Sequence, residues 1–483
     1  MSHRRPSVAI VGGGFGGVGA AAMLKREGYE DVTVFEKGER VGGVWQANTY
    51  PGAACDVPSH LYEFSFAPNS WSRRFSPGPE IRAYIEGVAR RFGVLDRVRT
   101  GIEVKSARWS EESGRWQLET SAGPHEADVL LTACGQLSVP KVPAIPGLES
   151  FDGPVFHTAE WRHDVELAGK RVAVVGTGCS AIQVVPAIQP EVAQLDVYQR
   201  SPGWTTPKND REYSRLERAL FKHLPLLRRL DRLSVYLFHD IAALALTRHR
   251  WLLSLFRAIA KRQIESAISD PELRRKVTPT DEIGCKRIML TDEWYPTLTE
   301  PNVDLIDSGV EAVTQSGIRD RAGVERPADA IVLATGFASH DFVAPMEIAA
   351  GGRTLSEEWA TVPRAYLGLT VPGFPNMFLL YGPNTNGGSG SVVNTLECGI
   401  GHVLAALREM ERERARRIEV RAEAAEAFDR ELRAALAGTV WQTGCSNWYV
   451  DENGNDSSNW PWTWTAYRRR TRELASDAYA FAP

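Results

Sequence analysis

Paired cysteines, long apolar runs and a strong net charge are all missing from this sequence. The six cysteines include no C-x-x-C pair; this argues against a zinc site or other metal site and against a dithiol redox motif, and it fits a reducing cytosol. No apolar run approaches the ~18 residues that span a bilayer. A net charge of −4 argues against a general nucleic-acid-binding protein. Because a few basic residues lead directly into an apolar run, we expect no signal peptide and a cytoplasmic protein.

The chain is long enough for two or three domains. Its 483 residues exceed the size at which a single hydrophobic core stops growing. Connections rich in proline and glycine at 139–147 and 371–375 indicate stiff links between domains, because proline restricts φ.

The first part of the chain has the pattern of a dinucleotide-binding unit. An apolar strand, a G-x-G-x-x-G turn and a helix follow one another within residues 8–26, and a second strand ends at Glu36. Gly12 makes the tight turn, Gly14 lets a pyrophosphate approach the backbone, and Gly17 lets helix and strand pack closely. The helix N-terminus offers N–H groups to the phosphate, and Glu36 would accept hydrogen bonds from the ribose. A free ribose indicates FAD.

A second unit repeats this pattern with two changes. Alanine replaces the third glycine, at Ala181, and Arg200 stands at the position that corresponds to Glu36. A cation at this position suits the 2′-phosphate of NADP, and Ser201 adds a hydroxyl donor. The second unit therefore predicts an NADPH site.

Residues 211–280 differ from both units. This stretch has no glycine, Leu and Arg recur at helical spacing, and basic residues outnumber acidic ones about two to one. We interpret it as a helical insertion. A basic, Leu-rich helix also suits a membrane surface, but we expect it to pack against its own domain.

Two further motifs connect the sequence to a known family. The segment between the glycine-rich turns has the spacing F-x-G-x-x-x-H-x-x-x-W, from Phe151 to Trp161, and residues 42–56 have the sequence GGVWQANTYPGAACD. In both motifs the chain resembles the type I Baeyer–Villiger monooxygenases, which are FAD- and NADPH-dependent class B flavoprotein monooxygenases. The second stretch matches that family's longer signature at every specified position, and the resemblance covers essentially the whole chain.

The resemblance implies an α/β fold with two Rossmann-like dinucleotide-binding domains, for FAD and NADP, and a helical insertion. It also implies that the chain converts a ketone to an ester or lactone with NADPH and O₂ through a C4a-peroxyflavin. We expect the FAD-binding domain, first part, at 1–140; a linker at 141–155; the NADP-binding domain, first part, at 156–210; the helical insertion at 211–280; the NADP-binding domain, second part, at 281–370; and the FAD-binding domain, second part, at 371–483.

The segment Gly284-Cys285-Lys286-Arg287 resembles the family segment that presents its catalytic arginine. The peroxide must stay deprotonated to attack a carbonyl carbon, and the attack creates a tetrahedral anion. Because arginine stays protonated at any workable pH, Arg287 would stabilise both anions. Asp56 would hold the guanidinium through a charge-assisted hydrogen bond, so we expect both residues to be catalytic. Lys286 would reach the NADP phosphate.

The resemblance and the two glycine-rich units together predict a set of cofactor contacts. For FAD these are Gly12, Gly14, Phe15, Gly17, Glu36, Gly43, Val44, Trp45, Asp56, Tyr62, Val104 and Val392. For NADPH they are Gly176, Thr177, Gly178, Cys179, Ser180, Ala181, Arg200, Ser201, Lys286, Arg287 and Trp448, the last from a loop that in the family closes over NADP and substrate.

Two residues of the linking motif are expected to be structural: His157 is a satisfied histidine and Trp161 a packing anchor. Two departures from the family pattern bear on substrate scope. Arg162 stands where many members have Pro or Asp, and Ser389-Gly390 stands where the closest branch has His-Asn.

Two other functions stay open. A flavin-containing N- or S-monooxygenase has the same scaffold but needs no anion-stabilising arginine, and Arg162 slightly favours it. A non-catalytic sensor that binds flavin and NADP is the second. The expected partners are a small-molecule ketone and O₂, with no nucleic acid, no stable membrane insertion, and a monomer or weak dimer.

Overall fold

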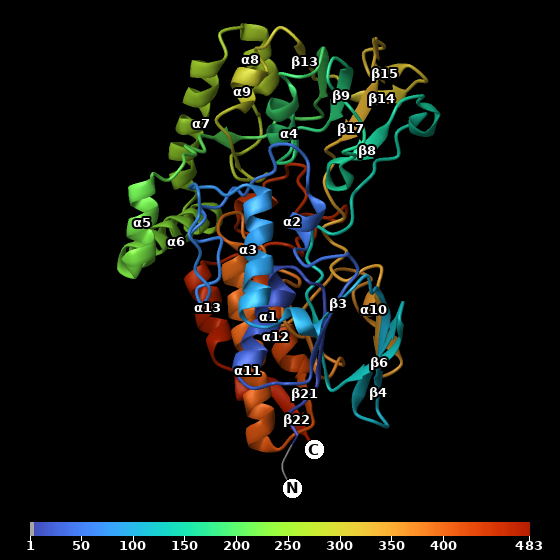
Figure 1. Ribbon diagram of the computed structural model, residues 1–483, viewed down its shortest axis with the longest axis vertical. Coiled ribbons are helices and arrows are strands. Elements are labelled where there is room, and N and C mark those ends of the chain that lie inside the picture. The colour runs from blue at the N-terminus through green and yellow to red at the C-terminus, as the bar shows by residue number, and fades with distance from the viewer. Residues whose placement is uncertain (1–3) are drawn as a thin grey trace.

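The computed structural model describes residues 4–483. Two five-stranded parallel sheets dominate the fold, one in each half of the molecule (Figure 1). The first has the order β20-β7-β1-β2-β3, with strands Met377–Leu379, Val129–Thr132, Val8–Val11, Val32–Glu36 and Val98–Thr100. The second has the order β13-β10-β9-β17-β8, with strands Val303–Ile306, Gln194–Tyr198, Arg171–Val175, Ala330–Leu333 and Val155–His157.

The two sheets share one local plan. The central strands β1 and β9 are apolar apart from Arg171 and mostly buried, as expected of strands covered on both faces. Each leads through a glycine-rich turn into a helix, α1 (Phe15–Arg26) or α4 (Ala181–Ile188). The predicted α/β class with two Rossmann-like units is confirmed.

Glycine is required where the chain leaves each central strand. Gly12 has φ +111° and Gly176 has φ +115°, a region that disfavours any residue with a side chain. A Cβ would also collide with a backbone carbonyl, that of Ala133 or Ala334 respectively. Gly178 is different, since its φ is ordinary and a Cβ there would meet open space. Local folding therefore does not require Gly178.

The chain leaves the first sheet, forms the second, and returns. Strand β20 joins the first sheet beside β7 although the whole second sheet lies between them in sequence. The domain boundaries given above stay a prediction. A third five-stranded sheet, which is mixed, has the order β19-β18-β4-β5-β6, with strands Arg353–Thr354, Glu347–Ala350, Val104–Ser110, Arg115–Thr120 and Gly123–Ala127. Three smaller sheets complete the fold: β14-β15-β16 at Val310–Val313, Gly317–Asp320 and Glu325–Pro327; β11-β12 at Thr205–Thr206 and Met289–Leu290; and β21-β22 at Arg417–Val420 and Tyr479–Ala482.

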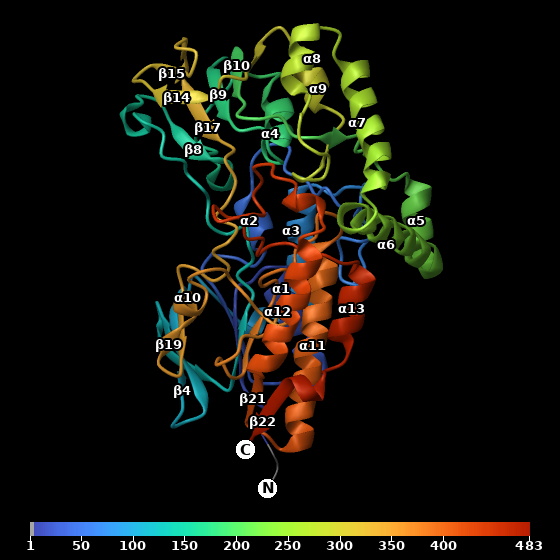
Figure 2. The ribbon, with the colours of Figure 1, turned by 180° about the vertical axis from the view of Figure 1, so that it is seen from behind.

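Helices cover the sheets from several directions (Figures 1 and 2). Those near the first sheet are α2 (Val44–Ala47), α3 (Gly78–Arg91), α11 (Val392–Glu413), α12 (Ala422–Leu436) and α13 (Trp464–Arg472), whereas α10 (Leu355–Glu358) packs against β18 and β19. Near the second sheet lie α7 (Leu253–Ala267), α8 (Pro271–Val277) and α9 (Trp294–Thr297), and α5 (Arg215–His223) and α6 (Pro225–Thr247) project from the side of the molecule. Across residues 4–483, the structure contains no helix with the length and apolarity to cross a bilayer.

Helices α5 to α8 agree with the expected helical insertion, but its packing differs from the expectation. One face of α6 is buried against the body of the protein through Val235, Ala242 and Leu246. The opposite face is exposed, with Leu226 at 66% and Leu230 at 52%. The polar partners of the buried side lie in the ranges expected for the FAD-binding domain: Asp231 contacts His60, and Arg232 pairs with Glu397. The expectation that this stretch packs against its own domain is therefore wrong for α6, and it holds for α7, which packs against β11 and α9.

The two glycines provide a matched test of the first and second turns. We expect Gly12→Ala to lower the free energy of unfolding by on the order of 2–4 kcal/mol, because it adds backbone strain and a clash. Gly178→Ala should change it by less than about 0.5 kcal/mol. Urea denaturation followed by circular dichroism measures both. Equal stability of the two variants would contradict this account.

Candidate active site

One cavity, with a volume of about 2140 Å³, is lined by residues of both glycine-rich turns. Of the expected site residues, all but Gly17 and Ala181 line it. These two serve packing instead: a Cβ at Gly17 would collide with the carbonyl oxygen of Gly12, and Ala181 is fully buried. The structure thus brings the two expected nucleotide sites into one space.

The first turn has the donors and acceptors that an adenosine diphosphate group needs. Helix α1 begins after Gly14 without a side-chain cap, so its first N–H groups are free to bind phosphate. At the end of β2, the Glu36 carboxylate accepts hydrogen bonds from the N–H groups of Gly13 and Gly38, each at 2.7 Å. These bonds hold the carboxylate at the cavity wall, and its remaining lone pairs can accept from a ribose.

Aromatic side chains form the wall next to this turn. The indole Nε1 of Trp45 donates to the Tyr62 hydroxyl at 3.0 Å, and the Tyr62 ring packs edge-on against Phe15 at 5.2 Å. Gly43 allows the loop to approach the turn, since a Cβ there would lie 2.8 Å from the Cα of Gly14. Three other residues expected to contact FAD line this part of the cavity. Each is the first residue of a helix or strand: Val44 of α2, Val104 of β4 and Val392 of α11.

Five residues that line the cavity carry a buried polar atom with no hydrogen-bond partner within residues 4–483. The atoms are Oε1 of Gln46, Oδ1 of Asn48, Nε2 of Gln136, the Tyr198 hydroxyl and Oγ1 of Thr395. A buried polar group without a partner costs about 1–3 kcal/mol. Their convergence on one cavity fits a large polar ligand such as a flavin, whose ring carries both donors and acceptors.

The second turn is open to the cavity. Thr177, Gly178, Cys179 and Ser180 are exposed or half-buried, and a Cβ at Gly178 would meet open space. Since the packing of the turn does not need this glycine, the space above it suits the close approach of a pyrophosphate.

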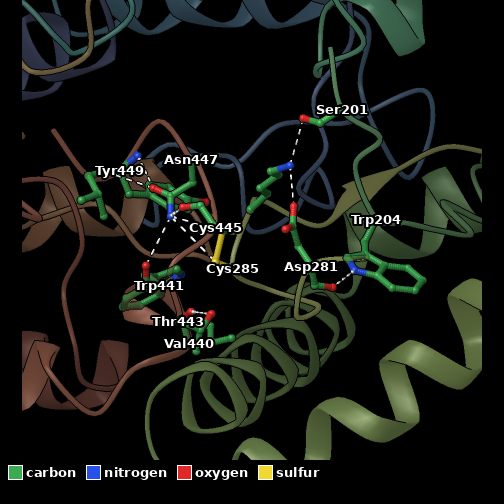
Figure 3. The surroundings of a disulfide bond; sticks show 12 residues. Ser201, Trp204, Asp281, Cys285, Val440, Trp441, Thr443, Cys445, Asn447 and Tyr449 are labelled. Atoms are coloured by element: carbon green, nitrogen blue, oxygen red, sulfur yellow. Dashed lines mark hydrogen bonds and ion pairs between the residues drawn. A yellow bond between two sulfur atoms is a disulfide. The ribbon is translucent and has the colours of Figure 1, made fainter. Parts of the chain in front are cut away.

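Two cations lie beside the second turn. The Lys286 ammonium donates to the Ser201 hydroxyl at 3.0 Å and forms an ion pair with Asp281 at 2.6 Å. Figure 3 labels these two partners, Ser201 and Asp281. Arg200, Ser201 and Lys286 line a hollow of about 380 Å³. A site with two cations and a hydroxyl suits a phosphate monoester.

Arg287 and Asp56 form an ion pair at the wall shared by the two turns. Nε and Nη2 of Arg287 donate to Oδ2 of Asp56, at 3.1 and 2.6 Å. Burial opposes ionisation of Asp56, but the charge of Arg287 and its hydrogen bonds hold the pKa of the carboxyl below its ordinary value. The charge of Asp56 in turn raises the pKa of Arg287 well above its ordinary value.

Sequence reasoning missed His239 of α6, which does not line the cavity but lies near enough to the ion pair for both charges to influence its pKa. Its Nδ1 lies 2.7 Å from the hydroxyl of Ser389. Ser389, one of the residues that departs from the family pattern, therefore contacts the helical insertion. Burial lowers the pKa of His239 to about 4, with a further lowering by Arg287 that Asp56 opposes. The histidine is therefore neutral at physiological pH. No motif marks it, because its partner lies 150 residues away.

A second missed residue is Gln183 of α4. Its Oε1 accepts from the Tyr50 hydroxyl and its Nε2 donates to the carbonyl of Ala54, each at 2.9 Å. Tyr50 and Ala54 belong to the 42–56 signature loop. Gln183 thus fastens the loop of the first nucleotide unit to the helix of the second.

The linking motif reaches the cavity through Ala159 and Glu160, whereas His157 and Trp161 do not line it. His157 is buried, and its Nδ1 accepts from the N–H of Ala159 at 3.0 Å. Trp161 packs edge-on against Phe156 at 5.1 Å. Arg162 pairs with Asp164 at the surface and does not line the cavity. Nε2 of His157 is buried without a partner among residues 4–483, so the expectation of a satisfied histidine holds for one ring nitrogen only; the packing of Trp161 agrees with its expected role as an anchor.

Two of the scattered cysteines, Cys285 and Cys445, form a disulfide with a Cα–Cα distance of 6.3 Å (Figure 3). Sequence spacing did not indicate this pair, because 160 residues separate the partners. The bond joins the segment of Arg287 to the loop of Trp448. The Asn447 side chain also holds that loop, since its Oδ1 accepts from the N–H of Tyr449 at 2.9 Å.

Comparisons with known proteins agree with this geometry. The family of pyridine nucleotide-disulphide oxidoreductases matches residues 9–224. The chain is 45% identical to a Baeyer–Villiger monooxygenase of Streptomyces coelicolor, over 98% of this chain and 92% of that protein. It is 44% identical to one of Pseudomonas aeruginosa, over 99% and 91%.

Solved structures give the same result. An oxidised steroid monooxygenase bound to NADP superposes with a TM-score of 0.88 at 33% identity, and the match covers 99% of both chains. Cyclohexanone monooxygenase from Rhodococcus sp. Phi1 bound to NADP⁺ superposes with a TM-score of 0.87 at 27% identity, with the same coverage.

The disulfide can be tested without any ligand. We expect a non-reducing peptide map to contain a Cys285–Cys445 cross-linked peptide. Cys445→Ser should lower the free energy of unfolding by about 2–4 kcal/mol, since a cross-link over a long loop restricts the unfolded chain. It should also speed proteolytic cleavage within 445–455. Cys398→Ser, at a cysteine outside the disulfide, is the control. Identical maps with and without reductant would refute the bond.

Proposed function

Because the chain belongs to the Baeyer–Villiger monooxygenase family, we propose that its central cavity converts a ketone to an ester or lactone, with Arg287 and Asp56 as the catalytic pair. The enzyme is a flavoprotein monooxygenase that uses FAD and NADPH. One observation carries the assignment of the pair: a permanently charged guanidinium lies in a cavity lined by both dinucleotide turns.

FAD would be held along the first turn. Gly12, Gly14 and the N-terminus of α1 face its pyrophosphate, and Glu36 accepts from its ribose. Tyr62 and Trp45 flank the flavin ring, and the unpartnered oxygens of Gln46, Asn48 and Thr395 are available to it. When bound, FAD supplies the redox chemistry: it accepts a hydride from NADPH and activates O₂.

NADPH would bind along the second turn. Residues 176–181 receive its pyrophosphate, and Arg200 and Lys286 receive the 2′-phosphate, with Ser201 as a further donor. The adjacent loop brings Trp448, which is 36% exposed, to the same cavity. Trp448 would exclude water from the bound nucleotide.

Arg287 would stabilise the negative charge that develops on oxygen as the ketone reacts. Asp56 accepts from Nε and Nη2, which orients the guanidinium and leaves Nη1 for the substrate. Because the pKa of Arg287 is raised by Asp56, the group donates hydrogen bonds without releasing a proton. His239 and Ser389 would set the shape of the neighbouring wall and so contribute to substrate scope.

The alternative functions are less well supported. Arg162, which slightly favoured an N- or S-monooxygenase, pairs with Asp164 away from the cavity. A non-catalytic sensor has no need for a guanidinium oriented in the cavity. We further propose a monomer or weak dimer that acts on a small ketone; the Cys285–Cys445 disulfide argues against the reducing cytosol expected from the scattered cysteines. Two measurements separate these functions. NADPH consumption is compared with a ketone, a thioether and an amine as substrate, and the ester product is tested for ¹⁸O from ¹⁸O₂.

Arg287→Ala tests the catalytic assignment. We expect NADPH to reduce the bound flavin at a rate within about threefold of the wild type. Ester formation should fall by about 10²–10³-fold, the loss typical of removing one anion-stabilising donor. Stopped-flow absorbance measures reduction, and mass spectrometry measures the ester. Arg162→Ala, at an arginine outside the cavity, should leave both unchanged. Normal ester formation by Arg287→Ala would overturn the assignment.

Arg200→Ala tests the coenzyme assignment. We expect KM for NADPH to rise by about 10–100-fold, because a charge-assisted bond to the 2′-phosphate is worth about 1.5–3 kcal/mol, while KM for NADH stays the same. Arg319→Ala, at a surface arginine paired with Glu311, is the control. An equal rise in KM for NADPH and for NADH would show that Arg200 does not bind the 2′-phosphate.

A further inference from the structure

The outer face of α6 is an uninterrupted apolar stripe. Its large side chains recur at intervals of three or four residues, which places them on one side of a helix. They are 49–66% exposed, and they comprise Leu226, Leu230, Leu233, Leu237 and Ile241. An amphipathic helix normally buries its apolar stripe. Helix α6 leaves this one in solvent and buries the opposite side of the helix, which carries Val235, Ala242 and Leu246.

The neighbouring helices extend this surface. Helix α5 exposes Leu216 and Leu220, and α7 exposes Leu255 and Ile259, in each case one helical turn apart. The rings of Phe238 in α6 and Phe256 in α7 lie 6.5 Å apart and connect two of the stripes. We call this surface the apolar face of α5–α7. Of the eighteen exposed large hydrophobic residues between positions 4 and 483, thirteen lie within 216–259, so this is a patch and not ordinary scatter.

Trp251 lies at the turn between α6 and α7, in the short helix η4 (Arg250–Leu252). At 72% exposure it is the most exposed large hydrophobic residue in the described part of the chain. Tryptophan favours the boundary between water and hydrocarbon, because its ring is apolar and its N–H is polar.

Positive charge surrounds the apolar face. Eight exposed cations of this stretch have no ion pair within residues 4–483: Arg215, Arg218, Lys222, Arg229, Arg248, Arg250, Lys261 and Arg262. The acidic groups of the same helices are mostly engaged. Glu217 pairs with Arg211, Asp231 contacts His60, and the Asp240 carboxylate accepts from the N–H of Trp464. Only Glu212 and Glu265 are exposed acids of 211–265 without such a partner.

We propose that the apolar face of α5–α7 docks on an anionic phospholipid surface. The leucine, phenylalanine and tryptophan side chains enter the headgroup boundary, and the surrounding cations contact lipid phosphates. This is adsorption to the surface, since no described helix could span the bilayer. It goes beyond the reaction proposed above and does not depend on it.

The same charges disfavour a second copy of the chain as the occupant. A two-fold interface places identical surfaces against each other, so it would bring two sets of eight unpaired cations together. An anionic surface neutralises them instead. The helices are also firmly held from behind: Arg232 pairs with Glu397 at 3.2 Å, and Asp240 accepts from Trp464 N at 2.7 Å. The face is therefore presented by a rigid support.

Flotation of the purified FAD-loaded enzyme with vesicles tests the proposal. The two vesicle types are phosphatidylcholine alone and an equimolar mixture of phosphatidylglycerol and phosphatidylcholine. We expect at least about tenfold stronger binding to the mixed vesicles at low salt, and a loss of most of this preference in 0.5 M NaCl, because salt screens surface charge.

Two variants separate the apolar and the charged contributions. Leu230→Gln/Leu237→Gln and Arg218→Gln/Arg229→Gln should each weaken binding to the mixed vesicles by about tenfold or more, on the basis of about fivefold per cation near a charged surface. The controls are Leu95→Gln/Val324→Gln and Arg90→Gln/Lys105→Gln, which change exposed residues elsewhere. All four variants should retain the NADPH oxidation of the wild type with a ketone, which shows that they fold.

Several results would overturn the proposal. One is no binding to the mixed vesicles, and another is equal loss of binding in the variants and their controls. A third is a dimer in light scattering that Leu230→Gln/Leu237→Gln converts to a monomer, without vesicle binding by the wild type. That result would assign the face to a second copy of the chain.

Discussion

The contact between Arg287 and Asp56 is the constraint on which the site depends. Asp56 ends the signature loop beside the first nucleotide turn, and Arg287 follows the helical insertion that interrupts the second unit. Burying either charge alone would be costly, because the charge would lose its hydration. The attraction between the two partners offsets this loss. The pair therefore forms only when both halves of the molecule are folded and in contact. A cation held in this way can stabilise an anion in the cavity without reorganising.

Other contacts fasten the same cavity from different segments. Gln183 ties the signature loop to α4 through the Tyr50 hydroxyl, and His239 reaches from α6 to Ser389. The disulfide joins Cys285 to Cys445. All three connect residues more than a hundred positions apart. Gln183 and Cys445 line the cavity, and Ser389 lies next to Gly390, which also lines it. Together they keep two cofactor sites at a constant separation, which a hydride transfer between them requires.

Helix α6 links this site to the surface. One face supplies His239 to the cavity side and Asp240 to the start of α13, and the other presents leucines to solvent. A surface helix normally has one apolar face, which it buries, and a polar face toward solvent. Helix α6 differs because its solvent face is also apolar. No segment among residues 4–483 covers this second face. Its leucines therefore do not stabilise the fold by burial, and their role lies in contact with something other than this chain.

Local sequence determined the two nucleotide units and the identity of the candidate pair. Gly12, Glu36 and Arg200 could be assigned because a strand, a turn and a helix adjacent in sequence form these sites, and glycine at φ +111° has no substitute. Arg287 and Asp56 came from resemblance, since nothing in their spacing brings them together. Only the tertiary structure decided that the two turns share one cavity, that Cys285 meets Cys445, that His239 faces Ser389, and which face of α6 stays exposed. Each of these depends on contacts between segments far apart in the chain, and periodicity within a segment carries no information about its distant neighbours.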